Sequence, residues 1–183
     1  MQPRLILDRK KLDLTINRLC YQLIENHKTF SETVLIGIQP RGTHLSDRIY
    51  KRLKEITNQE IEYGLIDATF YRDDYRNSEK QLTPLPTTIR FSTEGKNVVL
   101  IDDVLFSGRT VRAAMDALLD YGRPKKVELL VLIDRRFTRE LPIQPDYVGK
   151  AIDSLTSERV KVEWEERDGS DQIWMVPAKT EKA

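Results

Sequence analysis

The stretch Val98-Val99-Leu100-Ile101-Asp102-Asp103-Val104-Leu105-Phe106-Ser107-Gly108-Arg109-Thr110 decides the fold of this chain. It opens with a continuous apolar run, which predicts a strand buried on both faces of a sheet. Two adjacent carboxylates follow, and after them a short Ser-Gly-Arg-Thr turn. From Thr110 apolar residues recur at helical spacing as far as a stop at Gly122, so the stretch is predicted to be a strand–turn–helix unit.

The turn before this helix has the chemistry of a phosphate site. Backbone amides point outward at a helix start, and the helix dipole adds a partial positive charge there. Gly108 allows the backbone to approach a ligand closely, and the hydroxyls of Ser107 and Thr110 are further donors. Asp102 and Asp103 are acceptors suited to two ribose hydroxyls or to the shell of Mg²⁺. The unit therefore favours a ribose 5-phosphate ligand, although acidic pairs and helix caps of this kind also occur without one.

An earlier part of the chain repeats the arrangement. The run 34–38 predicts a short buried strand, and apolar residues from Leu45 to Ile56 predict a second helix. Pro40, Arg41 and Gly42 lie in the loop between them, which is again suited to an anion.

The segment after the second helix is predicted to form a β-hairpin. Residues 61–71 alternate between apolar and polar, and the polar stretch from there to Pro86 predicts a mobile, exposed loop. Residues 87–92 then resemble a returning strand. The alternative, a solvated hairpin without function, remains open from the residues alone.

The remaining pattern predicts an α/β fold. Residues 9–28 form an amphipathic pattern typical of a helix, and residues 127–133 predict a buried strand that ends at Asp134-Arg135. Strands are also predicted at 160–164 and 171–176. Strands and helices alternate from 33 to 133, which indicates a mainly parallel sheet whose strand ends meet in one cleft. The first helix and the strands of 135–176 are expected to form a small hood over that cleft.

The composition limits the number of domains and the cellular compartment that we expect for the protein. The chain has 183 residues, 39% of them hydrophobic and 32% charged, which predicts a single domain over 1–183 with a frayed tail from 177. No apolar run approaches the ~20 residues of a membrane span, and no signal-peptide pattern precedes the first helix. The lone Cys20 lies on the apolar face of that helix, so it is expected to be a core residue in a protein of the reducing cytoplasm.

Two groups of residues have an ordinary and a functional interpretation. Residues 41–54 carry five cations against one carboxylate, which suits either a nucleic-acid backbone or the solvated face of a helix. His27 and His44 lack any partner set of catalytic or ligand residues nearby in the sequence, so structural roles are predicted for both.

The quoted stretch resembles the phosphoribosyl pyrophosphate signature of type I phosphoribosyltransferases. Together with D-R…R-E-L-P-I at 134–143 and D-Y-V-G-K at 146–150, it resembles the bifunctional pyrimidine operon attenuator/uracil phosphoribosyltransferase family from about Leu5 to about Val176. The resemblance implies a type I phosphoribosyltransferase fold with a hood and a flexible hairpin loop. It implies that uracil and phosphoribosyl pyrophosphate give UMP and pyrophosphate with Mg²⁺ as cofactor. A homodimer or larger homo-oligomer, and leader mRNA as a further partner, are also implied.

The same resemblance assigns roles to residues that match the family's motifs. Catalytic roles go to Asp102, Asp103 and Arg72, and the two aspartates would also hold Mg²⁺, partly through water and substrate. The 5-phosphate would be bound by Phe106, Ser107, Gly108, Arg109 and Thr110. The pyrophosphate would be bound by Pro40, Arg41, Gly42, Tyr71 and Arg72, and the pyrimidine near Asp134 and Arg135.

Two further features bear on base choice and on RNA. Phe106 stands where purine-using relatives carry a carboxylate, and this favours a pyrimidine substrate. Arg18 and Lys150 match basic positions of the family's RNA surface, but four other positions depart from it and the 134–139 loop is one residue longer: the departures are Asn17, Tyr21, Asn26 and Gln144. Two alternatives to the enzyme therefore stay open, an RNA-binding attenuation regulator and a nucleotide-binding protein with little or no turnover.

Overall fold

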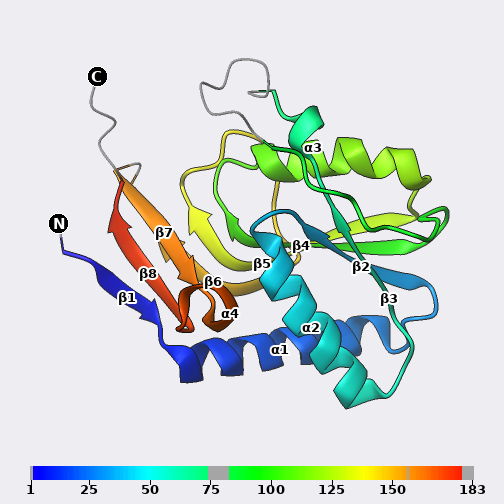
Figure 1. Ribbon diagram of the computed structural model, residues 1–183, viewed down its shortest axis with the longest axis horizontal. Coiled ribbons are helices and arrows are strands. Elements are labelled where there is room, and N and C mark those ends of the chain that lie inside the picture. The colour runs from blue at the N-terminus through cyan, green and yellow to red at the C-terminus, as the bar shows by residue number, and fades with distance from the viewer. Residues whose placement is uncertain (1, 74–82, 156, 179–183) are drawn as a thin grey trace.

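A five-stranded parallel sheet forms the centre of the molecule (Figure 1). The computed structural model describes residues 2–73, 83–155 and 157–178. The strand order is β3-β2-β4-β5-β6, and every neighbouring pair is parallel. The strands are β2 (Thr33–Ile38), β3 (Glu62–Ile66), β4 (Asn97–Leu105), β5 (Lys126–Arg136) and β6 (Tyr147–Asp153). The predicted α/β fold with a parallel sheet is confirmed.

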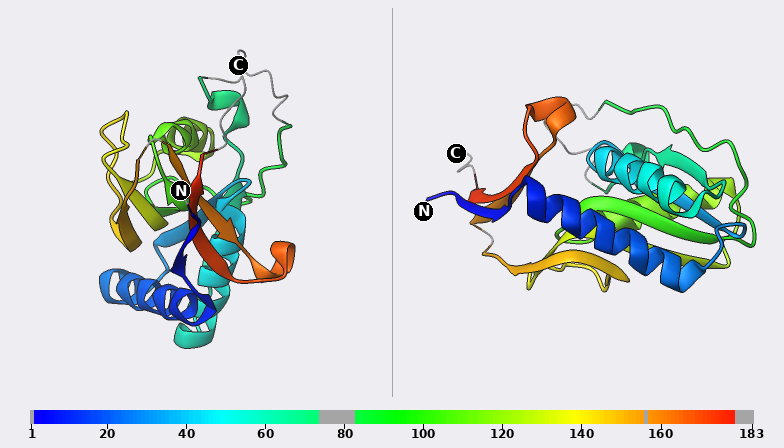
Figure 2. Two further views of the ribbon diagram at one scale, coloured as in Figure 1. Left: turned by 90° about the vertical axis from the view of Figure 1, so that its left-hand side faces the viewer. Right: turned by 90° about the horizontal axis from the view of Figure 1, so that it is seen from below.

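Helices cover both faces of this sheet, as the views in Figure 2 show. Helices α1 (Arg9–His27) and α2 (Gly42–Thr57) pack on one face, and α3 (Arg109–Leu118) packs on the other. Successive side chains of a strand point to opposite faces. Val99 and Ile101 of β4 therefore join the core with α1 and α2, while Val98 and Leu100 join the core with α3. The continuous apolar run of β4 is explained by this burial on both faces.

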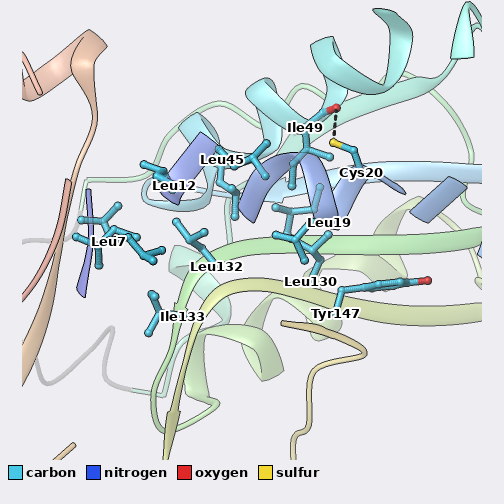
Figure 3. Close-up of a cluster of buried hydrophobic side chains, with 14 of the residues drawn as sticks. Leu7, Leu12, Leu19, Cys20, Leu45, Ile49, Leu130, Leu132, Ile133 and Tyr147 are labelled. Atoms are coloured by element: carbon cyan, nitrogen blue, oxygen red, sulfur yellow. Dashed lines mark hydrogen bonds between the residues drawn. The ribbon is translucent and has the colours of Figure 1, made fainter. Parts of the chain in front are cut away.

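Cys20 lies in the core between α1 and α2, as predicted (Figure 3). Its side chain is fully buried, and its sulfur lies 3.9 Å from the backbone oxygen of Ile49. Burial raises the pKa of this thiol to about 12, although the charge of Arg52 opposes the shift. Cys20 is therefore a packing residue and a poor nucleophile at neutral pH.

A second, antiparallel sheet forms the hood, and its composition differs from the prediction. It has the order β1-β8-β7, with β1 (Arg4–Leu7), β7 (Glu158–Glu163) and β8 (Gln172–Pro177). The short helix α4 (Glu165–Asp168) joins β7 to β8. The predictions that the first helix belongs to the hood and that all strands after 135 do so are wrong, because α1 packs on the parallel sheet and β6 pairs with β5. An amphipathic pattern identifies a buried face but not the element that covers it.

The predicted hairpin is present only as a strand and an irregular return. After β3 the chain forms the short 3₁₀ helix η1 (Thr69–Tyr71), and residues 74–82 of the predicted loop lie outside the described residues. Residues 87–92 form no strand. The hydroxyls of Thr88 and Thr87 accept from the amides of Leu65 and Asp67 at 2.9 and 3.0 Å, and the Thr88 amide donates to the Leu65 oxygen at 2.9 Å, so side-chain bonds take the place of most of a regular ladder.

Two smaller predictions are corrected at the ends of elements. The buried face of α3 consists of Val111, Leu118 and several alanines, whereas Met115 is 44% exposed. The helix ends in the 3₁₀ helix η2 (Leu119–Tyr121) before Gly122. Pro177, where fraying was predicted to start, belongs to β8, and residues 179–183 lie outside the described residues.

Candidate functional site

The two aspartates lie at the carboxyl end of β4 and are almost fully buried. Asp102 is 5% exposed and Asp103 is 6% exposed. The amide of Asp103 donates to the carboxylate of Asp102 at 2.9 Å. Burial raises the pKa of both carboxyls; repulsion from Asp103 adds to the shift at Asp102, while the charge of Arg41 opposes the shift at both. A buried acidic pair of this kind attracts positive charge, whether on a metal ion or on a substrate.

The loop between β4 and α3 is held in place from behind. Gly108 has φ +94° and precedes the first residue of α3. The backbone oxygen of Ser107 accepts from the amides of Glu140 and Leu141 at 3.0 and 3.2 Å. The Arg109 amide donates within the loop to the Ser107 hydroxyl at 3.4 Å, and the positive end of the helix dipole at the start of α3 favours an anion there. The binding of a 5-phosphate by this loop stays a prediction.

Thr138 and Arg139 are residues of this site that the sequence did not single out. The Thr138 hydroxyl and the Arg139 guanidinium both donate to the backbone oxygen of Phe106. Arg139 also forms an ion pair with Asp134. The available signal was the extra residue in the 134–139 loop, but its contact partner lies about thirty residues earlier and had no sequence signature.

The second loop lies directly against the acidic pair. Arg41 precedes α2, and the Gln39–Pro40 bond before it is cis. A Cβ atom at Gly42 would lie 2.5 Å from the backbone oxygen of Ile101 and 3.1 Å from the Cα of Asp102. Only glycine permits this approach, so the structure brings the Arg41-Gly42 loop and the acidic pair together as predicted.

Residues 71–73 lie along α3. The Arg72 guanidinium donates to the hydroxyl of Thr110 at 3.5 Å, and the Tyr71 hydroxyl donates to Asp120. Asp73 forms an ion pair with Arg109. The structure therefore places Arg72 beside the predicted 5-phosphate loop, and its contact with pyrophosphate stays a prediction.

Arg109 was predicted to bind the 5-phosphate, and its charge is already matched within the protein. Besides Asp73, it pairs with Glu140 at 2.7 Å. The Arg109 side chain is therefore engaged with two carboxylates, and its contact with a 5-phosphate stays a prediction.

Asp134 and Arg135 lie inside β5, and their side chains are engaged within the chain. Arg135 is 5% exposed and donates to the Ser154 hydroxyl at 2.8 Å and to the Leu155 and Glu158 backbone oxygens at 3.0 and 2.9 Å. Its guanidinium carbon lies 4.2 Å from the centre of the Phe106 ring. Arg135 therefore supports the Phe106 ring from one side, which the sequence had not indicated.

The donor set at the acidic pair fits Mg²⁺. Among the described residues no group of three or more histidine, cysteine or acidic side chains converges on one point, so the chain offers no complete protein cage for a metal. Mg²⁺ commonly uses one or two carboxylates and completes its shell with water and substrate phosphate. Asp102 and Asp103 provide that smaller set.

Ion pairs within the chain favour the ordinary interpretation of the cationic stripe 41–54, the solvated face of a helix. Four of its five cations form ion pairs within the chain: Arg48 with Glu166 and Asp171, Lys51 with Asp47, Arg52 with Asp13, and Lys54 with Glu60. The stripe also borders a cavity of about 470 Å³ between α1, α2 and α4, lined by four cations and four carboxylates. This balance of charge selects neither an anion nor a cation.

The predicted RNA residues and the two histidines all have contacts within the chain. Arg18 donates to the backbone oxygens of Val148 and Gly149, and Lys150 donates to that of Ile6 at 3.4 Å. Arg18 and Lys150 thus lie on one surface, at the border of α1 and β6. His27 is buried and bonds to Glu128 at 2.9 Å, and the centre of the His44 ring lies 6.1 Å from that of Trp164 with the planes tilted by 33°, so both have structural contacts.

Comparison with known proteins gives consistent results. Residues 5–167 match the model of the phosphoribosyl transferase domain family. The chain is 43% identical over 173 residues to the bifunctional protein pyrR of Enterococcus faecalis, covering 94% of this chain and 96% of that one. It is 45% identical over 170 residues to the bifunctional protein PyrR of Ligilactobacillus salivarius, covering 92% and 95%.

Solved structures of similar fold include two hypoxanthine phosphoribosyltransferases. The Staphylococcus aureus protein has a TM-score of 0.73 at 19% identity, with 98% of this chain and 94% of that chain covered. The Trypanosoma cruzi protein has a TM-score of 0.72 at 17% identity, with 96% and 97% covered. At these identities the likeness concerns the fold. No helix among the described residues has the length and apolar character of a membrane span.

Proposed function

Because this chain belongs to the phosphoribosyl transferase domain family, and within it to the bifunctional PyrR proteins, we propose that it is a uracil phosphoribosyltransferase that also regulates pyrimidine operon expression. The reaction joins uracil to the ribose 5-phosphate of phosphoribosyl pyrophosphate and releases pyrophosphate. The observation that carries the proposal is the buried acidic pair between two helix-start loops, each suited to a phosphate group.

The substrate would lie across the ends of β2 and β4. The amides of residues 107–110 bind the 5-phosphate, and the partial positive charge of the α3 start favours it. Asp102 and Asp103 accept hydrogen bonds from the ribose hydroxyls. The Arg41-Gly42 loop binds the diphosphate, with Arg72 as a second cation. Binding these remote groups fixes the anomeric carbon, which is how such a site gains rate.

The bond to the diphosphate breaks as the bond to uracil N1 forms; the departing diphosphate takes the bonding electron pair, and the N1 proton is released to water. Positive charge develops on the anomeric carbon during this exchange, and the carboxylate of Asp103 stabilises it. When bound at Asp102 and Asp103, Mg²⁺ supplies charge that neutralises the departing diphosphate.

Base choice follows from the ring at position 106. Phe106, supported by Arg135, is apolar and offers no proton partner to a purine ring. We therefore assign a pyrimidine to the space in front of it, with backbone groups near Asp134 and Arg135 contacting the base, because both side chains are already hydrogen-bonded.

The test is a nucleotide-formation assay with Mg²⁺, phosphoribosyl pyrophosphate and uracil, with hypoxanthine and orotate in parallel. UMP from uracil alone is expected, and it should fall to background with a chelator. Product from hypoxanthine would contradict the base assignment. Tight UMP binding without product from any base would favour the regulator with little turnover.

RNA binding and self-association are the remaining parts of the proposal. The adjacent positions of Arg18 and Lys150 favour an RNA surface at the α1–β6 border. A homodimer or larger homo-oligomer is proposed from the family, and light scattering of the purified protein measures it.

A further inference from the structure

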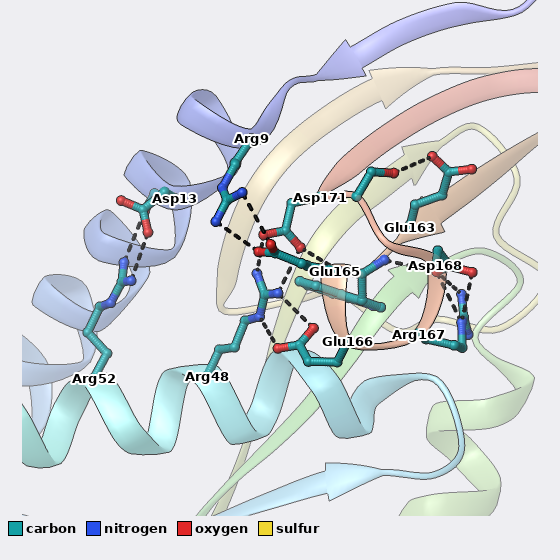
Figure 4. Close-up of polar contacts among 12 residues, drawn as sticks. Arg9, Asp13, Arg48, Arg52, Glu163, Glu165, Glu166, Arg167, Asp168 and Asp171 are labelled. Carbon is teal, nitrogen blue, oxygen red and sulfur yellow. Dashed lines mark hydrogen bonds and ion pairs between the residues drawn. The ribbon is translucent and has the colours of Figure 1, made fainter.

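Arg48 joins the hood to the helix that follows the pyrophosphate loop (Figure 4). Its Nε and Nη2 atoms donate to the two oxygens of Glu166 at 3.0 and 2.7 Å. Its Nη1 and Nη2 atoms donate to the two oxygens of Asp171 at 3.0 and 2.7 Å. We call Arg48, Glu166 and Asp171 the hood clamp.

The clamp is more enclosed than an ordinary surface ion pair. The Arg48 side chain is 22% exposed and that of Asp171 is 8% exposed. The guanidinium carbon of Arg48 lies 4.8 Å from the ring centre of Trp164, which is 1% exposed. Planar bidentate pairs with both carboxylates fix the direction as well as the distance between the groups.

The hood clamp connects the helix that begins at the Arg41-Gly42 loop with the hood turn at α4. Arg48 follows Gly42 by six residues in α2, which is about 9 Å along the helix, and Gly42 lies against Ile101 and Asp102. On the hood side, Glu166 is followed by Arg167, which pairs with Asp168 at 2.9 Å and whose positive charge also favours the ionised form of Asp103. Arg167 itself is held by a bond to the backbone oxygen of Val162 at 3.1 Å.

We propose that Arg48 is a positioning residue, which fixes the hood turn at α4 relative to the Arg41-Gly42 loop so that both reach the diphosphate. This rests on the proposed function and adds a residue to its site. Among the described residues, the 5-phosphate loop and the Phe106 ring are supported by other side chains, those of Arg135, Thr138 and Arg139. Loss of the clamp should therefore weaken pyrophosphate binding and spare UMP binding.

Arg52 provides a matched control for a merely stabilising role. It lies one turn further along α2 and pairs with Asp13 at 2.7 Å and with Asn17 at 3.0 Å, both in α1. Its side chain is 28% exposed, close to that of Arg48. A variant at Arg52 removes a similar arginine from the same helix without releasing the hood.

The experiment compares the full-length wild type with Arg48→Met, Arg48→Lys and Arg52→Met. Calorimetry measures the binding of pyrophosphate with Mg²⁺ and, separately, of UMP, and steady-state rates give KM for phosphoribosyl pyrophosphate. Arg48→Met should weaken pyrophosphate binding and raise this KM by about tenfold or more, with UMP binding within twofold. Arg48→Lys should recover part of the loss, and Arg52→Met should lower Tm while leaving both affinities within twofold.

Three results would overturn the proposal: wild-type pyrophosphate affinity in Arg48→Met, an equal loss for pyrophosphate and UMP, or the same loss in Arg52→Met. If Arg48→Met does not fold, Glu166→Gln decides, since Glu166 is 51% exposed and its replacement leaves the core intact. Pyrophosphate binding at the wild-type level in that variant would then reject the clamp's role. A wild type that binds neither ligand would instead contradict the proposed function.

Discussion

At the residue scale, burial of Asp102 and Asp103 makes their negative charges act more strongly on nearby positive charge. Both carboxyls lie at the end of one strand and have raised pKa values. The protein is therefore less stable when both are ionised. The positive charge of Arg41 reduces this loss of stability because it favours the ionised carboxylate. A bound cation, or positive charge at a reacting carbon, is then stabilised more than it would be in water.

Asp103→Asn tests this role directly. The amide keeps the shape but removes the charge, so we expect turnover to fall by about 10²-fold or more, without a fall in Tm because a costly buried charge is lost. Rates with saturating uracil and phosphoribosyl pyrophosphate, together with a melting curve, measure both. Asp47→Asn, which removes an exposed carboxylate paired with Lys51, is the control and should retain wild-type rates. Undiminished turnover in Asp103→Asn would refute the assignment.

Gly42→Ala tests the contact between the second loop and the acidic pair. The new methyl group would overlap the backbone oxygen of Ile101, so the loop must move away from Asp102. We expect destabilisation of about 1–3 kcal/mol and a raised KM for phosphoribosyl pyrophosphate. Gly95→Ala is the comparison, since a Cβ there meets nothing within 4 Å and only its positive φ of 69° opposes it. If both variants keep the wild-type KM, the loop does not contact the diphosphate.

At the element scale, the hood is attached to α2 through charge and through a shared apolar core. Trp164, Ile173 and Met175 of the hood join the same buried cluster as α1 and α2. The bidentate ion pairs of the hood clamp also fix the orientation of the hood relative to α2, which apolar contacts alone do not do. Helix α2 thus connects the hood to the Arg41-Gly42 loop.

The clamp should make the protein sensitive to acid. Burial alone would raise the pKa of Asp171, but hydrogen bonds from Arg48 outweigh it, and the pKa values of both Asp171 and Glu166 are lowered. Carboxyls with lowered folded-state pKa values stabilise the protein above their ordinary values, 3.8 and 4.5 here, and this contribution is lost as pH falls through the lowered values. The Tm difference between wild type and Arg48→Met should therefore be largest near pH 7 and shrink below about pH 4. A difference that stays constant down to pH 2 would show that the carboxylates contribute nothing through their charge.

At the scale of the whole molecule, the sequence predicted the elements that neighbouring residues form, but not the contacts between residues that are far apart in the chain. The strand, acidic pair, turn and helix around Asp103 were predictable, because apolar periodicity and a glycine turn act within about twenty residues. The hood was predicted incorrectly because β1 pairs with β8, and Leu5 lies opposite Trp174 at the other end of the chain. The support of Phe106 by Arg135 is likewise a contact between the loop after β4 and strand β5, which no local pattern encodes.

Enzyme and RNA surfaces should be separable in the whole molecule. Replacing Arg18 and Lys150 together by glutamine should weaken binding to an RNA hairpin from a pyrimidine operon leader. The slope of log affinity against log salt should fall by about 0.7 for each lost phosphate contact. UMP formation should remain within twofold of wild type, because both residues lie at the α1–β6 border. A matching loss of UMP formation would contradict the separation, and unchanged RNA affinity would remove both residues from the RNA surface.

The buried thiol of Cys20 has a practical consequence for spectroscopy. The native chain contains one cysteine, and its raised pKa and full burial make it unreactive toward maleimides under native conditions. A Leu155→Cys variant, in which the replaced side chain is 61% exposed beside the hood, would therefore be labelled selectively without removal of the native cysteine. A fluorophore at that position would report hood movement in the otherwise unaltered protein.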